Sequence, residues 1–118
     1  MGDLSEHFSR KEFECQCGCG FDTVDIELLE ALETIRHRYM KGIKITSGCR
    51  CAKHNKAEGG ADDSQHTKGR AADFKVKDME PEEIYNFLCR TYPKTFGIGI
   101  YHNRIHIDSR QEKARWSA

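Results

Sequence analysis

The sequence predicts an α+β domain with a mainly antiparallel sheet and helices packed on one face. Apolar residues recur at helical spacing in residues 23–40 and again after Pro81. They alternate with polar residues, as in a strand, in three stretches: residues 41–47, 72–76 and 104–108. The order helix, strand, loop, strand, helix, strand, with short connections, favours antiparallel pairing. We expect a single domain, 1–118, because a chain of 118 residues forms one modest core.

Two stretches have the pattern of amphipathic helices. In residues 23–40 the apolar positions follow at gaps of four, three and four: Leu28, Leu32, Ile35 and Tyr39. Gly42 is expected to end this helix. The second helix begins near Pro81, because the first helical turn tolerates proline. Its apolar stripe contains three residues: Ile84, Phe87 and Leu88.

Two shorter helical segments are also expected. Ser9 followed by Glu12 is a capping-box pattern, so a short turn is predicted there, with Phe8 and Phe13 available to pack. Residues 52–57 are predicted to form a short helix before a loop rich in glycine and aspartate. The first segment precedes the helix of residues 23–40, and the second follows the first predicted strand.

The alternation within the predicted strands assigns side chains to faces. Phe74 and its alternating apolar neighbours face the core, which leaves Asp73 on the opposite face. Ile105 and Ile107 likewise face the core. Three polar residues of the last strand then share the other face: Arg104, His106 and Asp108. The chain is expected to become extended again from Gly97 onward.

The composition excludes several classes of protein. Lysine plus arginine and aspartate plus glutamate each number 19, so a net charge of zero gives no general attraction to nucleic acid or anionic lipid. No apolar run is long enough to cross a membrane, and the first residues lack the pattern of a secretory signal. We therefore expect a soluble monomer that is made in the cytoplasm, without membrane insertion and without a nucleic-acid partner.

Six cysteines are many for this length, and three of them form the group Cys15, Cys17 and Cys19. Their alternating spacing is not the two-residue gap of common zinc knuckles. Without a signal peptide, reduced thiols in a loop are the preferred interpretation, and a second zinc ion is the alternative. A cysteine-cluster domain that binds nucleic acid is a third hypothesis, against which the neutral net charge argues.

Three further side chains are candidate metal ligands. His66 ends a loop, Gly69 permits a turn, and Asp73 follows on the next strand. His106 lies on a separate strand, so all three donors are able to converge on one face of one sheet. Two histidines and a carboxylate leave zinc a fourth position for water, as catalysis requires. From the spacing alone, the alternative is that the two histidines are hydrogen-bonded surface or loop residues and that Asp73 caps a turn.

Several motifs together resemble a known superfamily. They are Ser64-x-His66-x-x-Gly69-x-Ala-x-Asp73, Ile105-His-Ile-Asp108, Ile45-Thr-Ser-Gly-Cys-Arg50 and the opening Phe8-Ser-x-x-Glu-Phe. The combination is similar to the zinc D-alanyl-D-alanine peptidases, which include phage endolysin peptidases and the hedgehog fold. The resemblance covers nearly the whole chain.

This resemblance implies roles for individual residues. His66, Asp73 and His106 would be the zinc ligands, and Arg50 would bind a carboxylate or carbonyl oxygen of the substrate. Ser64 would either hydrogen-bond within the loop that presents His66 or contact substrate. The implied activity is zinc-dependent hydrolysis of an amide bond in peptidoglycan stem peptides, as a D-Ala-D-Ala carboxypeptidase or an endolysin-type endopeptidase of the bacterial cell wall.

The general base departs from the pattern of many relatives. They place an acidic residue three positions before the last zinc histidine, and here that position is Asn103. Asp108 or His102 is therefore the predicted catalytic base. The alternatives are that Asp108 orients His106 and that His102 is an exposed turn residue. A noncatalytic zinc-binding module that binds wall peptide or a protein partner is the alternative function.

Overall fold

The computed structural model describes residues 2–20, 24–48, 50–57 and 65–117. The elements in chain order are η1 (Arg10–Phe13), α1 (Ile26–Tyr39), β1 (Ile43–Ser47), α2 (Ala52–Ala57), η2 (Gln65–Lys68), β2 (Ala71–Val76), α3 (Pro81–Thr91), β3 (Gly97–Ile100), β4 (Ile105–Asp108) and β5 (Ala114–Ser117). The α+β prediction is confirmed, and each helix and strand expected from periodicity is present. The parallel edge strand β5 was not predicted.

The five strands form one mixed sheet in the order β1-β2-β4-β3-β5. All neighbouring pairs are antiparallel except β3 and β5, which are parallel. β3 and β4 form a hairpin, so the stretch that the sequence marked only as extended is two paired strands. The register places Asp73 opposite His106 at the centre of the sheet.

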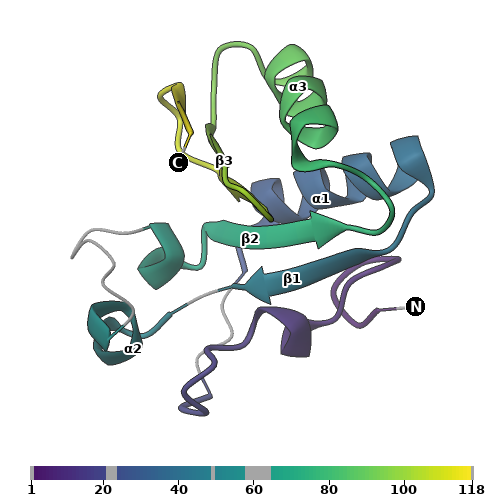
Figure 1. Cartoon of the computed structure of the whole chain (residues 1–118). Coiled ribbons are helices and arrows are strands. Elements are labelled where there is room, and N and C mark those ends of the chain that lie inside the picture. Colours follow the sequence, from purple (N-terminus) through teal and green to yellow (C-terminus); the bar gives the residue numbers. More distant parts are fainter. Residues whose placement is uncertain (1, 21–23, 49, 58–64, 118) are drawn as a thin grey trace.

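Helices α1 and α3 pack on one face of the sheet, and Figure 1 shows α1 behind β2. The core includes side chains from both helices and three strands, among them Leu28, Leu32, Ile35, Phe74, Ile84, Leu88, Ile98, Ile105 and Ile107. All of these except Ile98 are residues whose alternation or helical spacing predicted a buried face. The opposite face of β2 and β4 is consequently left for Asp73, His106 and Asp108.

Helix α1 ends before the glycine expected to stop it. Met40 adopts the left-handed conformation (φ 55°) and its backbone N–H donates to the Arg36 carbonyl, so Met40 and not Gly42 caps the helix. Gly42 instead accepts a hydrogen bond from the backbone of Lys77 beside β1. Within the described part of the chain, no helix is long and apolar enough to cross a membrane.

The N-terminal segment is fastened to α1 through Glu33. Ser5 donates its hydroxyl to this carboxylate, and His7 contacts it through both its backbone N–H and its ring. Burial by itself would raise the pKa of Glu33, but the hydrogen bonds from Ser5 and His7 outweigh it and lower the pKa. Phe8 and Phe13, as expected, enter the core next to this anchor.

Candidate metal centre

Three buried donors converge where β2 and β4 pair. Asp73 and His106 are opposite one another in the ladder, and His66 is supplied by η2 immediately before β2. The residues are 6%, 8% and 4% exposed, respectively. Their candidate ligand atoms all lie within 4.8 Å of one another. The structure therefore brings together the three residues that the sequence predicted as ligands.

Each imidazole has one nitrogen engaged away from the cluster. Nδ1 of His66 donates to the Gly48 carbonyl at 2.6 Å, which leaves Nε2 to face Asp73 Oδ1 at 3.5 Å. His106 has the opposite arrangement, with Nε2 2.8 Å from Asp108 Oδ2 and Nδ1 2.9 Å from Asp73 Oδ1. Outer partners of this kind set the tautomer and orientation of metal-binding histidines.

Asp108 is held behind His106 and not beside the open side of the cluster. Its side chain is fully buried, and Oδ1 accepts from the Gly97 backbone at 3.1 Å while Arg110 forms a two-pronged pair at 2.7 and 2.8 Å. Burial alone would raise the pKa of Asp108, but the hydrogen bonds from His106 and Arg110 hold it well below its usual range. This position matches the orienting alternative considered for Asp108.

Two glycines in β3 make room for the site. A Cβ at Gly97 would lie 2.5 Å from the Asp108 carboxylate, and one at Gly99 would lie 2.4 Å from Trp116 Nε1. Because Gly99 has no side chain, the indole lies against the sheet, with its ring centre 5.1 Å from that of His106. Trp116 also donates to the Tyr101 hydroxyl at 2.9 Å. The Gly-Ile-Gly strand thus accommodates one wall of the site.

Two guanidinium groups approach the second oxygen of Asp73. Arg50 Nη2 lies 3.7 Å and Arg104 Nε 3.8 Å from Oδ2, whereas both imidazoles approach Oδ1. Burial by itself would raise the pKa of Asp73, but the hydrogen bonds from His106 and His66 hold it far below its usual range. Asp73 is therefore ionised and presents Oδ1 to the two ring nitrogens.

The donor set fits zinc. Bonds of about 2.0–2.2 Å in tetrahedral geometry place neighbouring donors about 3.3–3.6 Å apart. The distance from Asp73 Oδ1 to His66 Nε2, 3.5 Å, lies in this range, and the distance to His106 Nδ1, 2.9 Å, is shorter, as for a hydrogen bond. One carboxylate and two imidazoles held by outer partners are typical of a catalytic zinc site with an open position.

A model of the peptidase M15 family matches residues 6–108. The chain belongs to this family. Members of the M15 family are zinc-dependent metallopeptidases that act on peptidoglycan-related substrates, which agrees with the two-histidine, one-carboxylate cluster. No curated protein and no solved structure gives a significant match to the chain.

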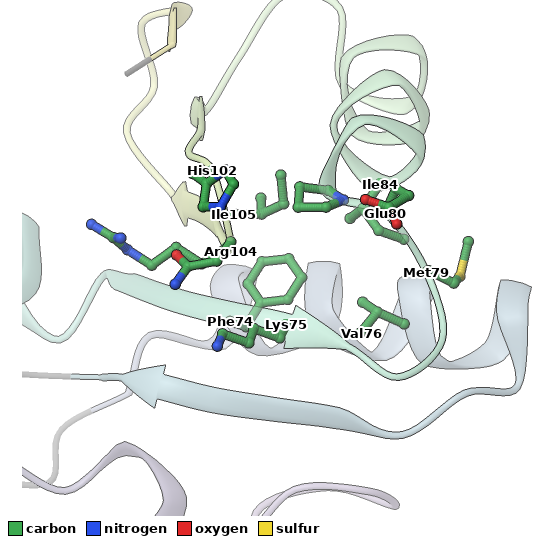
Figure 2. Close-up of a pocket in the computed structure, with 11 residues that line it drawn as sticks. Phe74, Lys75, Val76, Met79, Glu80, Ile84, His102, Arg104 and Ile105 are labelled. Atoms are coloured by element: carbon green, nitrogen blue, oxygen red, sulfur yellow. The ribbon is translucent and has the colours of Figure 1, made fainter.

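The other predicted site residues of this M15 family member are placed differently. Ser64 lies outside the described residues. His102 and Asn103 are exposed in the turn between β3 and β4. They line a cavity of about 210 Å³ at the end of β2 and the start of α3, shown in Figure 2. None of the three candidate ligands lines this cavity, although Arg104 reaches from its wall toward Asp73.

Sequence reasoning missed the groups that orient the ligands. The Gly48 carbonyl carries no side-chain signal, and it is the backbone of the Thr-Ser-Gly-Cys-Arg motif that brings it to His66. Arg110 follows Asp108 by two residues at the end of a predicted strand. A carboxylate and an arginine at this spacing point to the same side of an extended chain, and this was the signal that could have predicted their ion pair. The contact of Trp116 with His106 depends on the parallel pairing of β5, which periodicity does not reveal.

Proposed function

We propose that the protein hydrolyses an amide bond of bacterial peptidoglycan stem peptides, as a D-Ala-D-Ala carboxypeptidase or an endolysin-type endopeptidase. The observation that carries the proposal is the buried cluster of His66, Asp73 and His106 with two arginines beside its carboxylate. A zinc ion there supplies a Lewis acid that activates water and polarises a carbonyl oxygen. Family membership supports a peptidoglycan-related substrate.

Arg50 has the position and support of a group that binds substrate oxygen. Nε lies 3.3 Å from Ser47 Oγ, and Nη1 donates to Asn55 Oδ1 at 3.3 Å, so two neighbours fix the plane of the guanidinium. Its backbone N–H donates to the His66 carbonyl, which ties the arginine to a ligand segment. A fixed, planar cation is suited to a carboxylate or to charge developing on a carbonyl oxygen.

Arg104 is the more exposed of the two arginines. Its side chain is 38% exposed, against 15% for Arg50, and its guanidinium lies 4.2 Å from the centre of the Tyr101 ring. Stacking on Tyr101 keeps the charged group at the open side of the cluster. We assign Arg104 to binding the peptide on the side away from Arg50.

The proton-transfer group is a separate part of the proposal. The burial and full hydrogen bonding of Asp108 favour a role in orienting His106. His102 is the other predicted base, and it is exposed at the hairpin tip next to the cavity of Figure 2. A His102→Gln variant that keeps zinc and folding but loses hydrolysis would support His102 as the base. Unchanged hydrolysis would remove it from the mechanism.

We further propose that the protein acts as a monomer at the bacterial cell wall, after synthesis in the cytoplasm, with wall peptide as its binding partner. The neutral net charge and the absence of an apolar spanning helix in the described residues agree with this. The endolysin-like assignment rests on the sequence motifs. Nucleic acid is not part of the proposal.

A noncatalytic zinc-binding module is the second candidate function. It is favoured by Asn103 at the position where many relatives have an acid and by the engagement of Asp108 with His106 and Arg110. Such a module would bind wall peptide, or a protein partner, through the same arginines. Hydrolysis distinguishes the two candidates directly.

The deciding experiment is mass spectrometry of peptidoglycan fragments after incubation with the zinc-loaded protein. A chelated sample and a His66→Ala variant serve as negative controls, and His37→Ala, which changes an exposed histidine of α1, is the matched control. New peptide termini with the wild type and with His37→Ala alone would support the peptidase and identify the bond. Intact fragments after incubation with folded, zinc-bound protein would favour the binding module.

A further inference from the structure

A second group of possible metal ligands lies away from the histidine cluster. The thiols of Cys15, Cys17 and Cys19 are joined by Cys51, which precedes α2, and the four sulfur atoms lie within 4.8 Å of one another. Cys51 follows Cys15 by 36 residues, so the fold and not the local sequence brings it there. The sequence interpretation considered only the three loop cysteines and preferred reduced thiols.

The sulfur separations match a shared metal ion. Cys15 Sγ lies 3.5 Å from Cys17 Sγ and 3.8 Å from Cys51 Sγ, and the Cys17 and Cys51 sulfurs are 3.6 Å apart. Four thiolates at about 2.3 Å from a tetrahedral zinc ion have sulfur separations of about 3.8 Å. A disulfide bond needs about 2.05 Å, so none of these three measured pairs has that geometry.

The backbone around the thiols also suits bound thiolates. The N–H of Cys51 donates to Cys15 Sγ at 3.4 Å, and Cys15 is buried. Hydrogen bonds from backbone N–H groups to sulfur stabilise the negative charge that a metal ligand carries. Gly18, at φ +80°, reverses the chain between Cys17 and Cys19, a conformation that favours glycine.

We propose that Cys15, Cys17, Cys19 and Cys51 bind a second zinc ion in a closed site of four thiolates. Binding releases the thiol protons, and the four thiolates with one Zn²⁺ leave the site with a charge of −2. Thiolate ligands in tetrahedral geometry select zinc over hard cations such as magnesium and calcium. With four protein ligands there is no open position, so the ion is structural and takes no part in hydrolysis.

The site would brace the segment that supports the histidine cluster. Gln16 donates its side-chain amide to the Thr46 carbonyl, which ties the cysteine loop to β1. Phe13, two residues before Cys15, packs so closely on Gly48 that a Cβ there would lie 2.5 Å from Phe13 Cα. Gly48 in turn accepts the hydrogen bond from His66.

Arg50 lies next to Cys51 in the chain, so a metal at the four thiols would hold both Gly48 and Arg50 in place. The ion would therefore connect the N-terminal loop to the residues that orient His66 and bind substrate. This is a structural role, and it does not depend on whether the protein is a peptidase.

The first test is the zinc content of the full-length protein purified under reducing conditions, measured by elemental analysis. We expect two zinc ions per wild-type chain, one in Cys17→Ser and one in His66→Ala. Cys17 is exposed, so its substitution leaves the core intact, and Cys89→Ser, in α3 and outside the cluster, is the matched control that should retain two. A Cys17→Ser protein that holds as much zinc as the wild type would overturn the proposal.

The second test needs no change to the cysteines. X-ray absorption at the zinc edge of His66→Ala should show a single shell of sulfur at about 2.3 Å. A shell of nitrogen and oxygen alone, or a mass that shows the cluster cysteines of the freshly reduced protein joined as disulfides, would overturn it. Because neither experiment measures hydrolysis, an inactive protein with two zinc ions would refute the proposed function and leave this site supported.

Discussion

The substitution Asp108→Asn tests how the protein sets the binding tautomer of His106. Oδ1 of Asp108 accepts from the Gly97 and Arg110 backbones and from Arg110 Nε, at 3.1, 3.2 and 2.7 Å. An asparagine must therefore place its oxygen there and its NH₂ group toward His106 Nε2. A donor facing Nε2 moves the ring proton to Nδ1, the atom that faces Asp73.

The size of the effect follows from replacing the outer partner of a candidate metal ligand. Such replacements weaken metal affinity about 10- to 100-fold, which corresponds to about 1.4–2.7 kcal/mol. Asn has nearly the same shape as Asp, but its NH₂ group replaces the oxygen that accepts from Arg110 Nη2 at 2.8 Å, so the variant should be less stable and its folding is checked first. The expected result is weaker zinc binding at the histidine cluster by this factor, with correspondingly less hydrolysis at limiting zinc.

The assay is competition for zinc against a fluorescent chelator at pH 7. The same titration of His66→Ala identifies the binding step of the histidine cluster. Asp78→Asn is the matched control, because Asp78 is exposed and its φ of 59° is one that asparagine tolerates. A folded Asp108→Asn protein with wild-type zinc affinity at this step would refute the tautomer argument. Lost hydrolysis with unchanged zinc affinity would instead indicate that Asp108 transfers protons.

Three further predictions concern packing, substrate binding and acid stability. Gly99→Ala should displace the single tryptophan, Trp116, destabilise the fold by about 1–3 kcal/mol and change its fluorescence emission; unchanged emission would contradict the close contact. Arg50→Lys should keep zinc but lower kcat/KM about tenfold or more, since an ammonium cannot replace the planar fork, and equal kcat/KM would remove Arg50 from substrate binding. The pKa of Glu33 is lower in the folded protein than its ordinary value of 4.5. Glu33 therefore stabilises the fold at pH values above 4.5, and this stabilisation is lost as the pH falls below 4.5. Glu33→Gln should therefore cost about 1–2 kcal/mol in urea unfolding at pH 7 and progressively less at lower pH, and a pH-independent cost would contradict this assignment.

The secondary structure was largely readable because each element carries its own period. The spacing of Leu28, Leu32 and Ile35 buries one helix face wherever the helix packs, and the alternation around Phe74 assigns Asp73 to the opposite face. Alternation also placed Asp73 and His106 on one face, whereas His66 was a loop residue, and the resemblance of the motifs implied that all three are ligands.

The order of strands was not readable in the same way. Alternation states which face a side chain occupies but not which strand lies next to it, so the parallel pairing of β5 with β3 was missed. Because this pairing was missed, the contact between Trp116 and His106 and the reason for a glycine at position 99 were missed as well. The end of α1 was misplaced by a similar cause, since Met40 adopts a conformation usually reserved for glycine.

The sequence by itself determined most of the helices and strands, their buried faces and the residue types of the candidate metal ligands, because these depend on neighbouring residues and on residue type. Only the tertiary structure decided which distant groups meet. It placed Asp108 between His106 and Arg110, and it brought Cys51 to the cysteine loop. Such contacts join residues far apart in the chain or depend on side-chain direction, and they form when the whole core packs, so local periodicity carries no record of them.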